Sequence, residues 1–126
     1  MKIASWNVNS LNVRLPHLQQ WLAAFAPDIV GLQETKLDDA RFPDDALAAL
    51  GYRSVFSGQK TYNGVAILAR EEPREVLVGV PGFEHEHRRA IAATVHAPGS
   101  TDPDRAVRIV NLYVVNGQDV GTDKYA

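Results

Sequence analysis

Two polar side chains that could bind a metal ion stand directly after predicted strands. Asn7 ends a first alternating segment, and Glu34 follows the short apolar run of residues 29–32. An amide oxygen and a carboxylate are oxygen ligands of the kind that hold Mg²⁺, with waters completing the coordination shell. If the two strands are parallel neighbours, their carboxyl ends lie side by side at one edge of the sheet. Asn7 and Glu34 could then share one divalent cation.

Each of these residues also has a purely structural interpretation. An asparagine that follows a strand is commonly a turn former, and Asn7 is followed by Asn9 and Ser10. Glu34 could simply be the first solvated residue after a buried strand. Together the two residues point to a site more strongly than either alone, but they do not identify a reaction.

A third polar cluster, residues 111–118, follows the last predicted strand. In one interpretation Tyr113 packs in the core with its hydroxyl group bonded, and Asn116 begins a tight turn with Gly117. In the other, the Tyr113 hydroxyl lies in a cleft and donates to a phosphate oxygen. A weaker candidate is the polar loop of residues 59–64, in which Lys60 could lie along a nucleic-acid backbone.

The elements that must position these residues begin with a strand over residues 2–8. Pro16 is expected to open a helix that runs to residue 25 and is ended by Pro27. Its apolar residues recur at helical spacing and are expected to form a core face: Leu18, Trp21, Leu22 and Phe25. Residues 28–33 read as a strand buried on both faces. Strand, helix and strand together predict the right-handed crossover of a parallel pair.

Beyond Gly51 the sequence is dominated by short strands. A short helix is expected over residues 43–50, and a loop over residues 98–104. Five strands are predicted from runs rich in Val and Ile, at residues 52–57, 64–69, 74–80, 90–95 and 107–114. Two helices cannot cover both faces of so many strands, and an open apolar sheet face must be covered. We therefore expect this chain to be part of a larger fold.

Composition excludes several classes of protein. The 126 residues are 45% hydrophobic and 22% charged and include no cysteine, which excludes a disordered chain, a disulfide-stapled protein and a cysteine-based zinc site. No apolar run approaches the ~20 residues of a membrane helix, and no signal peptide opens the chain, so we expect a cytoplasmic protein that makes no membrane contact. The net charge of −2 does not favour a general nucleic-acid binder, but an enzyme that holds cations also needs carboxylates.

Taken together, the motifs resemble those of a known family. The segments are IASWNVN (residues 3–9), DIVGLQETK (28–36), GVAIL (64–68) and NLY (111–113). In this order and spacing they resemble the exonuclease III family of apurinic/apyrimidinic (AP) endonucleases, within the endonuclease/exonuclease/phosphatase superfamily. The resemblance extends over essentially all 126 residues.

The resemblance implies an α/β fold, a four-layer sandwich like that of deoxyribonuclease I, of which this chain is half: a mixed sheet with helices on its outer face. It implies cleavage of phosphodiesters with Mg²⁺ or Mn²⁺ held by Asn7 and Glu34. Tyr113 corresponds to the family's tyrosine beside the scissile phosphate. Asn116, with Asn9 and Lys60, is expected to contact the substrate.

The implied partner is double-stranded DNA that carries abasic sites or 3′ ends, and the intact enzyme is expected to be monomeric. The family's later Asp-x-Asn and Ser-Asp-His segments, which supply further metal contacts and activate the attacking water, have no counterpart among the 126 residues. We therefore expect residues 1–126 to be the N-terminal portion of a single truncated domain, inactive alone.

Two alternatives remain open at this point. Metal-site residues are shared across the superfamily, so the substrate could instead be RNA or an inositol or lipid phosphate. The chain could also be a non-catalytic one that binds DNA or pairs with a complementary half-enzyme chain.

Overall fold

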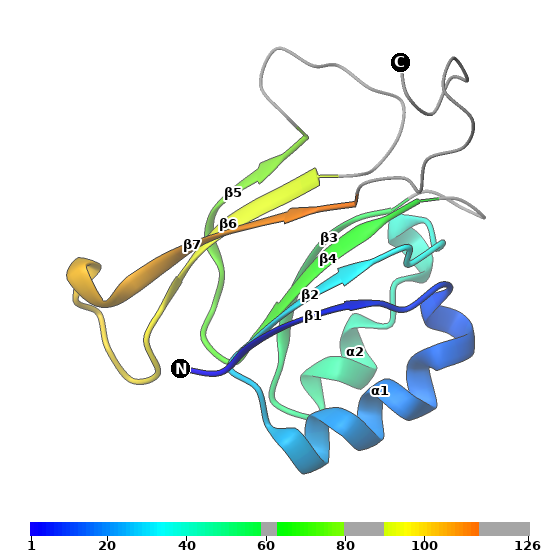
Figure 1. Cartoon of the computed structure of the whole chain (residues 1–126), viewed down its shortest axis with the longest axis horizontal. Helices are drawn as coiled ribbons and strands as arrows, with labels where there is room; N and C mark the ends of the chain where they lie inside the picture. The colour runs from blue at the N-terminus through cyan, green and yellow to red at the C-terminus, as the bar shows by residue number, and fades with distance from the viewer. Residues whose placement is uncertain (59–62, 80–89, 114–126) are drawn as a thin grey trace, which may run out of the picture.

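The structure, a computed structural model, describes residues 1–58, 63–79 and 90–113. Two sheets face each other, and two helices pack below the first sheet (Figure 1). The first sheet has the strand order β1-β2-β4-β3, and the second has the order β5-β6-β7. The bounds are β1 Ile3–Asn7, α1 Leu11–Phe25, β2 Ile29–Gln33, α2 Asp44–Ala48, β3 Arg53–Ser57, β4 Val65–Ala69, β5 Arg74–Val78, β6 Ala90–His96 and β7 Ala106–Leu112.

The predicted strand–helix–strand unit is confirmed, because β1 pairs with β2 in parallel and α1 connects them. The first sheet is mixed, since β4 lies antiparallel to both β2 and β3. The later strands and α2 fall within the segments predicted for them or differ by one or two residues at their ends. The fold class expected from the sequence, a mixed α/β sheet with helices on its outer face, is therefore correct.

The predicted start of α1 is wrong. The helix begins at Leu11, and Pro16 lies inside it rather than at its first position. Leu11 is fully buried and belongs to the core stripe with Leu18 and Leu22. Burial of this leucine offsets the one backbone hydrogen bond that the proline ring removes.

The predicted core role of Phe25 is also wrong. Its side chain is 45% exposed, and Trp21 is only partly buried. The two rings stack with their centroids 5.5 Å apart, and the Lys2 ammonium lies 5.0 Å from the Phe25 centroid. The narrow stripe of leucines faces the sheet, so the aromatic residues next to it lie on its margin.

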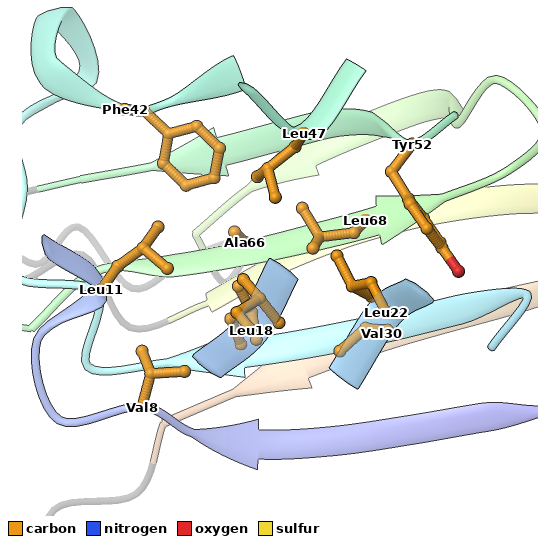
Figure 2. Close-up of a cluster of buried hydrophobic side chains, with 11 residues drawn as sticks. Val8, Leu11, Leu18, Leu22, Val30, Phe42, Leu47, Tyr52, Ala66 and Leu68 are labelled. Carbon is orange, nitrogen blue, oxygen red and sulfur yellow. The ribbon is translucent and has the colours of Figure 1, made fainter. Parts of the chain in front are cut away.

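Two cores hold the layers together. The first lies between the helices and the first sheet (Figure 2), and its buried members are Val8, Leu11, Leu18, Leu22, Val30, Leu32, Phe42, Leu47, Tyr52, Ala66 and Leu68. The second lies between the two sheets and consists of Ile29, Val65, Ile67, Ala69, Ile91, Ala93 and Val95. β2 and β4 are buried on both faces because they contribute to both cores.

The outer face of the second sheet carries no helix in the described ranges (Figure 1). On β7 the outward side chains of Val110 and Leu112 are 61% and 51% exposed. This agrees with the expectation that two helices leave one sheet face uncovered. Within the same ranges, no helix is long and apolar enough to cross a membrane.

Candidate active site

Asn7 and Glu34 lie together at the carboxyl edge of the first sheet. Asn7 is the last residue of β1 and is in register with Gln33, the last residue of β2, so Glu34 follows directly beside it. Tyr113 follows β7 in the second sheet, and its hydroxyl group donates to Oε1 of Glu34. The hydroxyl is thus hydrogen-bonded, as the structural interpretation required, and its partner is the carboxylate of the predicted metal site.

Lys36 connects the loops that follow β1 and β2. Its ammonium group donates to Oδ1 of Asn9 at 2.6 Å and lies 3.9 Å from Oε2 of Glu34. The backbone N–H of Asn9 in turn donates to Oδ1 of Asn7 at 3.0 Å. Asn9, Asn7 and Glu34 therefore belong to one connected polar cluster, and Lys36 places a positive charge at its centre.

The backbone around this cluster is strained. Of the seven non-glycine residues with positive φ in the described ranges, five lie in the loops at this edge: Asn9, Ser10, Glu34, Lys36 and Asn63. Left-handed conformations of this kind cost free energy for residues with a side chain, and they cluster at functional sites. At Glu34 the φ angle is 55°, so the carboxylate is held where a regular strand would not place it.

Hydrogen bonds between the loops maintain these conformations. The N–H of Ser10 donates to the carbonyl oxygen of Glu34 at 2.8 Å, and the N–H of Leu11 donates to the carbonyl oxygen of Thr35 at 2.9 Å. On the other side, Lys36 N–H donates to the carbonyl oxygen of Asn63 at 2.8 Å. These hydrogen bonds therefore join the loops after β1 and β2 and residue Asn63, just before β4, into one continuous edge.

Two oxygen ligands at this edge are of the type that a hard divalent cation prefers, but they do not form a complete coordination shell. The Glu34 side chain is 17% exposed and negatively charged, and Asn7, which is exposed, presents an amide oxygen. Both are oxygen donors of the type that Mg²⁺ and Mn²⁺ prefer. No group of three or more His, Asp or Glu side chains in the described ranges could hold a metal ion. Asn7 and Glu34 could therefore supply two of the oxygen ligands that such an ion requires.

Sequence reasoning missed the role of the residues beneath this edge. Gln33 and Asn111 are buried polar side chains between the two sheets, and Nε2 of Gln33 donates to Oδ1 of Asn111 at 2.6 Å. A signal was present in the sequence, because Asn111 interrupts the apolar strand of residues 106–112 at an inward-facing position. Of the predicted substrate-binding residues, Lys60 and Asn116 lie outside the described residues.

One hollow in the described part of the chain lies away from this edge. It has a volume of about 340 Å³ and is lined by basic side chains including Arg53, Arg70 and Arg74, with Glu71 and Glu72 between them. The Arg70 guanidinium donates to the Tyr52 hydroxyl oxygen at 3.5 Å, and this hydrogen bond raises the pKa of Arg70. None of the predicted site residues lines this hollow, so it is separate from the candidate active site.

Comparisons with known proteins agree with this geometry. Residues 4–120 match the model of the Endonuclease/Exonuclease/phosphatase family. The chain is 36% identical over 91 residues to exodeoxyribonuclease III of Haemophilus influenzae, an alignment that covers 72% of this chain and 34% of that protein.

Solved structures are similar over nearly the whole chain. A 3′ phosphatase from Neisseria, NExo, bound to a product DNA hairpin, is 51% identical with a TM-score of 0.88. An AP endonuclease from Archaeoglobus fulgidus is 38% identical with a TM-score of 0.87. Each similarity covers 99% of this chain but only 46% and 45% of the two larger chains. The chain therefore spans less than half the length of these relatives.

Proposed function

Because the chain belongs to the endonuclease/exonuclease/phosphatase family, we propose that its whole protein hydrolyses DNA phosphodiesters with Mg²⁺ or Mn²⁺ in base-excision repair. It would act as an AP endonuclease and as a 3′–5′ exonuclease of the exonuclease III type. The observation that carries this proposal is the hydrogen bond between Tyr113 and Glu34. It joins the two sheets at the edge where β1 ends with Asn7. The names of the relatives, an exodeoxyribonuclease III, a 3′ phosphatase and an AP endonuclease, support the same class of reaction.

Asn7 and Glu34 are the residues that would hold the metal ion. When bound, a divalent ion polarises the phosphate and offsets the negative charge that develops in the transition state. The Tyr113 hydroxyl, which Glu34 directs at the site, would exchange its bond to the carboxylate for one to a non-bridging phosphate oxygen when substrate binds. Asn9, held by Lys36, would contact a neighbouring phosphate. We assign Lys60 and Asn116 to substrate contacts as well, on the family resemblance alone.

The proposed substrate is duplex DNA with abasic sites or 3′ ends, bound by a monomeric protein. Contacts to the phosphate backbone would make affinity decrease as salt increases. An abasic nucleotide could enter the site by leaving the helix, which costs least where no base is paired. NExo in complex with a DNA hairpin supports DNA as the partner class.

The 126 residues are proposed to be the N-terminal portion of one catalytic domain. The described residues supply two oxygen donors for a cation, and none of the described histidines lies in a group that could hold a metal. We therefore expect the chain by itself not to cleave DNA, because hydrolysis also needs an activated water and a complete metal shell.

The test is to incubate the whole protein with a duplex that contains one abasic site, in Mg²⁺ and in EDTA. Parallel reactions contain an RNA of the same sequence and an inositol phosphate. The proposal predicts a single nick at the abasic site that requires Mg²⁺ and far slower turnover of the other two substrates. Preferred hydrolysis of RNA or of inositol phosphate would move the protein to another branch of the superfamily, and no hydrolysis of any substrate would contradict the proposed activity.

A further inference from the structure

We propose that Asn111 is a positioning residue, which fixes the second sheet over the first so that Tyr113 meets Glu34. The inference rests on the proposed function, because it concerns the same site. Asn111 itself touches neither Glu34 nor Asn7 among the hydrogen bonds of the described residues. It acts through the strands that carry them.

The Asn111 carboxamide bridges the two sheets with three hydrogen bonds. Nδ2 donates to the carbonyl oxygens of Leu32 at 2.8 Å and of Ala66 at 2.7 Å, two residues that are paired opposite each other on β2 and β4. Oδ1 accepts from Nε2 of Gln33 at 2.6 Å. Asn111 is 5% exposed, so all three contacts lie in the interior. These three bonds fix the position of β7 over β2 and β4 in the opposite sheet.

Gly31 allows this close approach. A Cβ added at Gly31 would lie 3.2 Å from both Cγ and Oδ1 of Asn111. A side chain at this position would therefore require the carboxamide to shift by a few tenths of an ångström. The contact needs glycine on β2 for space, since the φ angle of Gly31 is not in the left-handed region.

The bridge continues to β1 and ends next to the site. Nε2 of Gln33 also donates to Oγ of Ser5 at 3.0 Å. We call Ser5, Gln33 and Asn111 the inter-sheet network. Ser5 precedes Asn7 by two residues and Asn111 precedes Tyr113 by two, so each points to the same face of its strand as the site residue it precedes.

The network therefore lies directly behind the site residues on all three strands. Gln33 immediately precedes Glu34, so the bonds of Gln33 hold the end of β2 next to the site. Apolar contacts between sheets are not directional, whereas a carboxamide with three partners permits one alignment. A displacement of about 1 Å at a reacting group can cost on the order of 10²-fold in rate. Loss of the network should thus lower kcat.

The experiment compares variants of the whole protein in abasic-site nicking. Asn111→Ala removes the bridge, Gly31→Ala displaces it, and the double variant combines the two changes. We expect each single change to lower kcat by about 10- to 100-fold with KM changed much less. In the double variant, Gly31→Ala should add little, because the carboxamide it displaces is absent.

Tyr52→Phe is the matched control. It removes another buried hydrogen bond of the first sheet, from the Tyr52 hydroxyl to the carbonyl oxygen of Pro27 at 2.6 Å, away from the site. A comparable loss of thermal stability with unchanged kcat is expected. Ser5→Ala alters an exposed residue at the end of the network and supplies the kinetic test if Asn111→Ala does not fold.

A second measurement is independent of activity. The ring signals of Tyr113 in NMR spectra of tyrosine-labelled protein should shift in the Asn111 and Gly31 variants and stay in place in Tyr52→Phe. Unchanged Tyr113 signals and unchanged kcat would overturn the positioning role. If the native protein does not nick DNA but the signals shift as expected, the proposed function fails and the positioning role stands.

Discussion

Glu34 contacts three other residues of the candidate site. Its carboxylate accepts from the Tyr113 hydroxyl with one oxygen and faces Lys36 with the other, while its carbonyl oxygen accepts from Ser10. A positive φ angle of 55° directs it out of the strand that precedes it. These constraints favour a functional role for the carboxylate over a packing role, since Glu34 belongs to neither core.

At the residue scale, Tyr113→Phe tests the role of the phenol. The change removes the bond to Glu34 and leaves the ring packed against the core between the sheets. We expect kcat for nicking to fall by about 10²-fold, as is usual for the loss of a group that donates to the reacting phosphate. Unfolding should become easier by about 1 kcal/mol, the usual net value of one hydrogen bond. Steady-state kinetics and urea unfolding provide the two measurements.

The matched control for this change is Tyr52→Phe, which also deletes one phenolic hydroxyl bonded within the fold. It should show a similar loss of stability and no loss of kcat. Equal kinetic effects of the two changes would mean that Tyr113 acts through stability alone.

Sequence predicted the types of the site residues but not their partners. Asn7 and Glu34 were predictable as a pair because the parallel crossover places adjacent strand ends together. The bond between Tyr113 and Glu34 was not, since 79 residues separate them and two sheets had to be stacked first. The pairing of Gln33 with Asn111, which are 78 residues apart, was hidden for the same reason.

At the scale of elements, short loops hold the strand ends in place. The carbonyl oxygen of Gly64, just before β4, accepts from the N–H of Thr35, whose side chain is buried against it. Gly64 has a φ angle of 96°, and an added Cβ would lie 2.1 Å from Oγ1 of Thr35. The loop that carries Lys36 therefore depends on this glycine for both conformation and space.

Gly64→Ala should consequently be strongly destabilising. A left-handed alanine costs about 1–2 kcal/mol, and the clash with Thr35 adds about 1–3 kcal/mol. Gly51→Ala is the control, because Gly51 has a similar φ of 89° but nothing within 4 Å of the added Cβ. Urea unfolding should show Gly51→Ala to be less destabilising by about 1 kcal/mol or more. Equal losses would mean that the contact with Thr35 does not constrain the loop.

The prediction of elements succeeded where periodicity and neighbours agreed. The strand bounds followed from short runs of Val and Ile, and the crossover from the helix between two of them. It failed at Pro16, because proline commonly marks a helix start, whereas this helix begins five residues earlier and buries Leu11. It failed again at Phe25, because spacing alone does not show how wide a stripe the sheet can cover.

At the scale of the whole molecule, the two sheets are covered unequally. Helices α1 and α2 pack on the first sheet, whereas the outward residues of β7 and all of β5 are exposed in the described ranges. The relatives are more than twice as long as this chain, as the 46% and 45% coverage indicates. An apolar sheet face that is open to water favours association.

The 126-residue chain by itself should therefore self-associate as its concentration increases. Val110→Thr combined with Leu112→Thr should reduce this association, since threonine keeps the strand conformation and removes apolar surface. Val13→Thr on α1, at a valine that is 59% exposed, is the control and should have little effect. Sedimentation velocity over a range of concentrations measures the self-association of each variant. A monomeric chain at every concentration would show that this face is not adhesive.

The most direct test of the central claim is the rate of abasic-site nicking by the whole protein with Glu34→Gln, over a series of Mg²⁺ concentrations. Loss of the carboxylate charge should lower the rate by at least about 10²-fold, as removal of one charge-stabilising group commonly does. Glu72→Gln makes the same change at an exposed glutamate paired with Arg53, and should leave the rate unaltered. A Glu34→Gln protein that nicks at the native rate and with the native Mg²⁺ dependence would contradict the assignment of this edge as the active site.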